Sequence, residues 1–172
     1  VFPILEDLAI KSGYKKINSL IDPKKLELIS KNNPTIEGCI IAFYTENEPY
    51  LSEAKLFINN LEKINLKYQI HKYKAKDNWV SNCAIKPLFI KKMRNSIKGP
   101  LLYVDIDANI HKNPWEYLNL YDCDIAAWIT KKGILASGTI LINDTKGARE
   151  AIDKWINYQE KNPLEWDKKT LQ

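Results

Sequence analysis

Arginine is scarce in this sequence, in which Arg94 and Arg149 are the only arginines among 26 basic residues. Arginine is the side chain that most often recognises bases and phosphates through paired hydrogen bonds, so the net charge of +5 does not indicate a nucleic-acid-binding protein. The lysines are mixed with glutamates along helix-like segments, which is typical of a solvated surface. We therefore expect no nucleic-acid partner and only a mild attraction for anionic ligands.

Cysteine is also rare, and its three positions, Cys39, Cys83 and Cys123, are widely spaced in apolar surroundings. This pattern favours reduced thiols over a disulfide framework or a zinc site, and so favours a reducing compartment. No apolar run approaches the roughly 20 residues of a membrane helix, and no signal-peptide pattern is present. We predict a cytoplasmic location, on the assumption that no anchor or signal has been removed upstream of Val1.

The sequence of 172 residues also lacks a linker rich in proline, glycine or serine, so we expect one main domain. Residues 1–35 are predicted to form a short helical N-terminal extension, in which Asp22-Pro23 is typical of a helix start. Residues 36–172 are predicted to form the domain itself.

Apolar runs and helical periodicity alternate along that domain. Strands are predicted at Gly38–Phe43, Lys67–Tyr73, from Leu101, at Asp124–Ile129 and at Gly138–Asn143, and amphipathic helices at 51–64, 85–93 and 148–161. Alternation of this kind is typical of an α/β fold with a mostly parallel central sheet flanked by helices.

Two carboxylates follow the apolar run Leu101–Val104, at Asp105 and Asp107. If the strand continues through them, both side chains point to the same side, because strand side chains alternate between faces. Two facing carboxylates repel each other unless a cation lies between them, and a divalent metal with oxygen ligands is the common solution. The alternative is a turn after a buried strand, which also favours aspartate.

The carboxyl ends of the strands are the expected ligand-binding edge of an open α/β sheet. Tyr44 and Thr45 end the first predicted strand, and Asp105 and Asp107 end the third. Two separate signals therefore point to the same edge.

Several blocks of residues resemble, in order, the GT-A-type nucleotide-diphospho-sugar transferases, whose hallmark is an Asp-x-Asp motif closing a hydrophobic strand. The matching blocks are Phe43-Tyr44-Thr45, the Trp79, Asn82 and Lys86-Pro87 segment, Leu102–Pro114 with its Asp-x-Asp, Ala136–Ile140 with Ser137-Gly138, and Trp166-Asp167 with Leu171-Gln172. Together they span about residues 38–172.

The resemblance implies a single, Rossmann-like GT-A domain and a hexosyltransferase-type activity. Such an enzyme moves a sugar from a nucleotide-diphosphate sugar, here a UDP-sugar, to a hydroxyl of a glycan, protein or small-molecule acceptor. It also implies Mn²⁺ or Mg²⁺ as cofactor, which would neutralise the charge that develops on the leaving diphosphate.

Each matching residue receives a role from the resemblance. The metal ligands are Asp105 and Asp107, the donor-binding residues are Tyr44, Thr45, Trp79, Asn82, Lys86, Asp105, Ser137 and Gly138, and the catalytic residue is Asp167. Several of these roles have a structural alternative. Tyr44 can simply pack, Lys86 can face solvent, Ser137-Gly138 can follow a tight turn, and Asp167 can cap the helix that starts at Lys168.

The sequence departs from the family pattern at two places. Lys168 stands where the family usually has glutamine after the late aspartate. Many members also supply a third metal ligand, often histidine, from residues further along, and neither His71 nor His111 matches it. Either the domain is truncated at Gln172, or water and the donor complete the metal shell.

Two other functions are consistent with parts of the sequence. A non-catalytic module could bind the nucleotide sugar without transferring it. A haloacid-dehalogenase-like phosphatase also has an Asp-x-Asp after a hydrophobic strand, but Asn109 replaces its expected threonine or valine and little chain follows.

Overall fold

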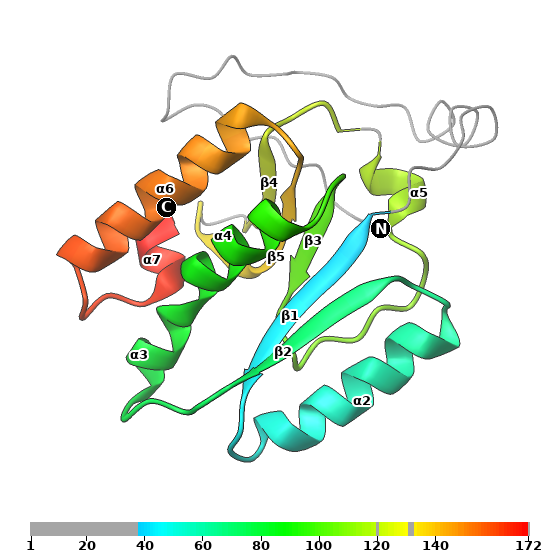
Figure 1. Cartoon of the computed structure of the whole chain (residues 1–172), viewed down its shortest axis with the longest axis horizontal. Helices are drawn as coiled ribbons and strands as arrows, with labels where there is room; N and C mark the ends of the chain where they lie inside the picture. Colours follow the sequence, from blue (N-terminus) through cyan, green and yellow to red (C-terminus); the bar gives the residue numbers. More distant parts are fainter. Residues whose placement is uncertain (1–37, 120, 131–132, 172) are drawn as a thin grey trace.

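A computed structural model of the chain describes residues 38–119, 121–130 and 133–171 (Figure 1). The predicted helical extension of residues 1–35 lies outside the described residues. The elements are β1 (Cys39–Thr45), α2 (Tyr50–Lys63), β2 (Tyr68–Tyr73), α3 (Trp79–Cys83), α4 (Ile85–Ser96), β3 (Leu101–Val104), α5 (Trp115–Leu118), β4 (Ile125–Ile129), β5 (Leu135–Ile142), α6 (Lys146–Lys161) and α7 (Asp167–Leu171).

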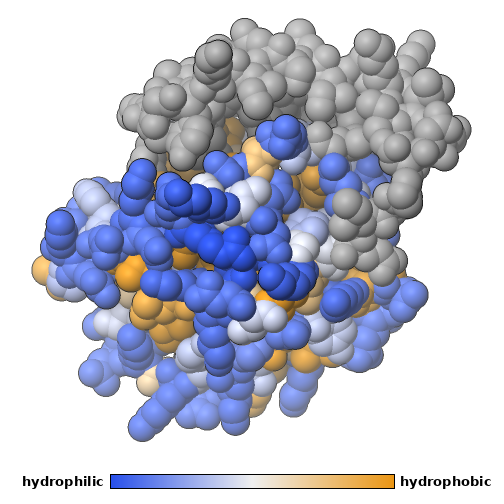
Figure 2. All heavy atoms as spheres, turned by 45° about the horizontal axis from the view of Figure 1, so that its top comes forward, coloured by the Kyte–Doolittle hydropathy of each residue, from blue (hydrophilic) through white to orange (hydrophobic). Residues whose placement is uncertain are grey.

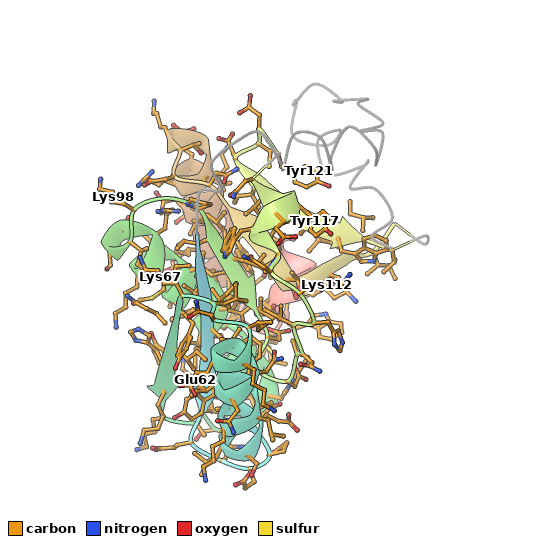
Figure 3. All side chains as sticks on the ribbon, turned by 90° about the vertical axis from the view of Figure 1, so that its right-hand side faces the viewer. Glu62, Lys67, Lys98, Lys112, Tyr117 and Tyr121 are labelled. Atoms are coloured by element: carbon orange, nitrogen blue, oxygen red, sulfur yellow. The ribbon has the colours of Figure 1, made fainter. Side chains whose placement is uncertain are left out.

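The strands form one sheet in the order β2-β1-β3-β5-β4. β1 lies in the centre of a parallel group with β2 on one side and β3 on the other. Ile41 of β1 is level with Tyr103 of β3, so the carboxyl ends of these two strands meet at the same edge. Lys67 and Lys98 precede β2 and β3 and lie toward the opposite, amino-terminal edge (Figure 3).

The prediction of a mostly parallel sheet is wrong, because only β2, β1 and β3 are parallel to one another. β5 runs antiparallel to β3 and also antiparallel to β4. β4 ends at Ile129 and β5 begins at Leu135, and this connection is much shorter than the dozen or so residues that a parallel crossover needs. The two strands therefore pair as a hairpin, and β5 fills the position beside β3.

The central strands are buried on both faces, as their continuous apolar sequences predict. In β1, Cys39 and Ile41 pack into one core cluster, and Ile40 and Ala42 pack into another. The first cluster receives apolar side chains of α4 and α6, and the second receives those of α2 and α5. Helices thus cover both faces of the sheet, and the α/β prediction is confirmed at this level.

Polar side chains predominate on the face shown in Figure 2, where apolar side chains form small, separate patches. Tyr117 of α5 is one of the exposed aromatic residues and lies near Tyr121 in Figure 3. Across residues 38–119, 121–130 and 133–171, the structure contains no helix with both the length and the apolar character needed to cross a membrane.

Candidate functional site

Asp105 and Asp107 lie in a turn immediately after β3. The strand ends at Val104, and Ala108 N donates to Asp105 O at 3.1 Å. The alternation of a strand therefore does not extend to Asp107, whose side chain is exposed. The turn that the sequence allowed as an alternative is present, and it carries both carboxylates to the carboxyl edge of the sheet.

The backbone and side chain of Asp105 are both held in place by neighbouring strands. Its amide donates to Gly138 O on β5 at 2.8 Å, and its Oδ1 accepts a hydrogen bond from the Tyr103 hydroxyl at 2.7 Å. A Cβ added at Gly138 would lie 2.9 Å from Asp105 Oδ2, so glycine permits this close approach. The carboxylate is nevertheless 40% exposed, which leaves it accessible to a ligand.

Lys86 is a buried cation at the centre of the site. Its Nζ lies 3.1 Å from Asp105 Oδ1 and 2.6 Å from Asp167 Oδ2, and it donates to Ser137 O at 3.2 Å. Ser137 O accepts a hydrogen bond from the ammonium group, and the two carboxylates pair with it as ions. In this arrangement Lys86 does not face solvent, and its donors are already engaged by the protein.

The charge of Lys86 is stabilised by its partners rather than by water. Burial alone would lower the pKa of this ammonium. Its position in the first turn of α4 is also unfavourable for a positive charge, because the amino end of a helix dipole is itself positive. The carboxylates of Asp105 and Asp167 outweigh the burial, so the pKa of Lys86 lies above its usual value. The side chain therefore remains charged at neutral pH.

Asp167 begins α7, where a carboxylate is favoured by the helix dipole. Its side chain is 5% exposed, and its Oδ2 contacts Lys86 as an ion pair without the alignment of a hydrogen bond. The Cys83 thiol lies beside this group, and burial, together with the Asp167 charge, raises the pKa of Cys83 to about 12. The thiol is thus protonated and inert at neutral pH.

Tyr103 is a member of the site that the sequence interpretation missed. Its ring is buried, Lys86 Nζ lies 5.1 Å from the ring centroid, and its hydroxyl bonds Asp105. Burial and the nearby Asp105 charge raise the pKa of Tyr103 well above its usual value, so it acts as a donor. The signal was present, because residues 103 and 105 are two positions apart and share a strand face.

Among the described residues, the other predicted donor-binding residues make no hydrogen bond or ion pair to this centre. Thr45 is buried at the end of β1, and Tyr44 packs against the core cluster on the α2 side. Asn82 Oδ1 accepts a hydrogen bond from the backbone of Lys76 at 2.8 Å. Trp79 is half exposed and contacts Trp166, with ring centroids 5.2 Å apart.

The fit of a metal ion depends on the two aspartates. Among the described residues, no group of three or more histidine, cysteine, aspartate and glutamate side chains is placed to hold a metal. Asp105 and Asp107 supply oxygen atoms, the donor type that Mn²⁺ and Mg²⁺ prefer, and Asp105 Oδ2 is not used by Lys86. By donor type, these carboxylates would suit a divalent ion whose shell was completed by diphosphate oxygens and water.

Comparison with known proteins gives a fold but no family. No protein-family model matches this sequence, and no curated protein matches it. Among solved structures, the chain resembles a glycosyltransferase involved in the glycosylation of the major capsid of PBCV-1, with a TM-score of 0.54 and 12% identity. The match covers 78% of this chain and 74% of that chain. The described architecture is therefore a glycosyltransferase-like fold.

Proposed function

We propose that this chain is a metal-dependent glycosyltransferase that moves a sugar from a UDP-sugar to an acceptor hydroxyl. The observation that carries the proposal is the position of Asp105. This partly exposed carboxylate lies at the carboxyl edge of the sheet and is held by the buried groups of Tyr103 and Lys86. Ligands of open α/β sheets bind at this edge, and the fold is one that a glycosyltransferase also uses.

In the proposed enzyme, Asp105 and Asp107 hold the metal through their carboxylate oxygens. When bound, the divalent ion supplies positive charge to the leaving diphosphate of the donor. Tyr44, Thr45 and Trp79 then border the space for the nucleotide and sugar.

Lys86 and Tyr103 have positioning roles in this proposal. Both bind Asp105 Oδ1, which directs the carboxylate without occupying its Oδ2 atom. A group fixed before the ligand arrives loses little freedom on binding, so it binds more tightly than a mobile one. Lys86 thus acts on the donor through Asp105 rather than by direct contact.

Asp167 receives a different role from the one that the resemblance implies. A general base must reach the proton that it removes. Asp167 is buried and paired with Lys86, so we assign it to holding Lys86 in place. Because a buried and paired Asp167 is not free to act as a general base, the same ion pair favours a second candidate function. This is a module that binds a nucleotide sugar without transferring it.

A thermal-shift panel of nucleotide diphosphates and UDP-sugars, each with Mn²⁺ or with chelator, tests the proposal. A ligand present at about 100 times its dissociation constant should stabilise the fold by about 2.7 kcal/mol. Release of uridine diphosphate from a bound UDP-sugar on adding acceptors would distinguish the enzyme from the binding module. Absence of stabilisation by every nucleotide in the panel would contradict both.

A further inference from the structure

The only two arginines of the sequence meet in the folded chain. Arg94 lies on α4 and Arg149 on α6, and both contact Asp144, which follows β5. Arg94 Nη2 lies 3.3 Å from Asp144 Oδ2, and Arg149 Nη2 lies 2.5 Å from Asp144 Oδ1. A single carboxylate therefore pairs with two guanidinium groups.

Arg94 forms the inner part of this cluster and is almost completely buried. Its Nη1 donates to Ile142 O at 3.2 Å, and its Nη2 donates to Ile97 O. Its Nε is buried and has no hydrogen-bond partner among the described residues. Leaving a buried donor unpaired is unfavourable, so the cluster has more donor groups than its own acceptors satisfy.

Arg149 and Lys91 form the outer part of the cluster. Arg149 Nη1 donates to Thr145 O at 2.8 Å and Nη2 pairs with Asp144, which leaves the remaining N–H groups of this fork unused among the described residues. Lys91 pairs with Asp153 at 2.8 Å, and both of these side chains are about half exposed. Water weakens such an exposed pair, so Lys91 remains available to another anion.

A hollow of about 200 Å³ lies between α4 and α6 at these residues. It is lined by Lys91, Arg94, Asn95, Arg149, Ile152 and Asp153. Three of these residues are cations, and the carboxylates beside them are Asp153 and Asp144. The hollow thus combines a positive balance of charge with unused N–H donors.

This hollow lies away from the site at Asp105. Arg94 bonds the last residue of β5, Ile142, which is paired with Leu101, the first residue of β3. Asp105 follows the last residue of β3 instead. Lys86 and Arg94 are also eight positions apart on α4, which corresponds to about 12 Å along a helix. The two sites are on opposite edges of the sheet.

We propose that the hollow between α4 and α6 binds a phosphate group. Arg149 and Lys91 would be its ligands, and the buried Arg94 lines the inner side of the hollow. A guanidinium fork matches the oxygens of a phosphate group through paired hydrogen bonds. The group can come from inorganic phosphate or from a small phosphorylated molecule, because both present the same oxygens.

The experiment is calorimetric titration of the full chain with inorganic phosphate and, separately, with glycerol 3-phosphate, at constant ionic strength set with sodium chloride. We expect one or both ligands to bind, and Arg149→Gln to weaken the binding at least tenfold. The matched control is Lys146→Gln, which removes the same charge from the same helix at a side chain that is 92% exposed. It should bind as the parent does.

Several results would overturn the proposal. The first is that neither phosphate binds, and the second is that the parent and Arg149→Gln bind phosphate with equal affinity. The third is that Arg149→Gln and Lys146→Gln lose affinity equally, which would indicate general attraction to a basic surface. If Arg149→Gln does not fold, Lys91→Gln replaces it, with an expected loss of at least threefold. Asp107→Ala should bind phosphate normally, so failure here is distinguishable from failure of the glycosyltransferase proposal.

Discussion

Lys86 Nζ lies 2.6 Å from Asp167 Oδ2, and both side chains are almost completely buried. The pair joins the first turn of α4 to the first turn of α7. Lys86 also contacts Asp105, the carboxylate that we place at the donor. It therefore connects the buried Asp167 to the exposed part of the proposed site.

Removing the cation should destabilise the protein strongly. Lys86→Met leaves the buried Asp167 carboxylate without its counter-ion, and breaking a buried pair in this way costs about 3–5 kcal/mol. The free energy of unfolding, measured by denaturant titration, should fall by this amount.

Lys91→Met is the control for that loss, because it removes a lysine from the same helix with an ion pair of 2.8 Å to Asp153. Both partners of this pair are about half exposed, so the expected cost is below about 1 kcal/mol. Similar losses in the two variants would show that Lys86 is not a buried structural cation.

Tyr103→Phe should separate the role of the hydroxyl, which positions Asp105, from the role of the ring, which packs in the core. The ring remains in the core, but Asp105 loses the hydrogen bond from the tyrosine hydroxyl. Hydrogen bonds to charged groups contribute about 1.5–3 kcal/mol, and the exposure of Asp105 places the expected stability loss at the lower end.

In the same variant, affinity for uridine diphosphate with Mn²⁺ should fall, and affinity measured with chelator should not change. Tyr117→Phe, at an exposed tyrosine of α5, is the control and should alter neither quantity. An unchanged affinity in Tyr103→Phe would remove Tyr103 from the proposed site.

Asp144 should make stability depend on pH in acid. The hydrogen bond from Arg149 holds the pKa of Asp144 below its usual 3.8, against the opposing effect of burial. A carboxylate with a lowered pKa stabilises the folded state above pH 3.8, and this contribution is lost as pH falls through the folded-state value. The difference in unfolding free energy between the parent and Asp144→Asn should therefore shrink as pH is lowered from 6 toward 2. A difference that stays constant over this range would contradict the assignment.

The strands and long helices could be predicted from the sequence, because their apolar patterns are strong. The order and direction of the strands could not, since a strand pattern carries no information about its neighbour. The predicted strands that end at Ile129 and begin at Gly138 are separated by a short segment, which was an available signal for a hairpin. It was outweighed by the general alternation of strands and helices.

The site was predictable in part. The rule that the carboxyl ends of parallel strands meet at one edge of a sheet predicted Tyr44 and Asp105 at the same edge. Only the family resemblance pointed to Lys86 and Asp167. The burial of Lys86 could not be predicted, because lysine usually lies at the surface and only the fold brings two carboxylates to it. Tyr103 was missed because it looked like a core residue of the strand, which it also is.

The most direct test of the account is calorimetric titration with uridine diphosphate of the parent and Asp107→Asn, with Mn²⁺ and with chelator. Asp107 is exposed, so Asp107→Asn should leave the melting temperature of the metal-free protein unchanged or slightly higher. We predict that the parent binds at least tenfold more tightly with Mn²⁺ than with chelator, and that Asp107→Asn with Mn²⁺ binds as weakly as the chelated parent. Equal affinity of the parent in both conditions, or unchanged affinity in Asp107→Asn, would contradict a metal-bridged donor site at Asp105 and Asp107.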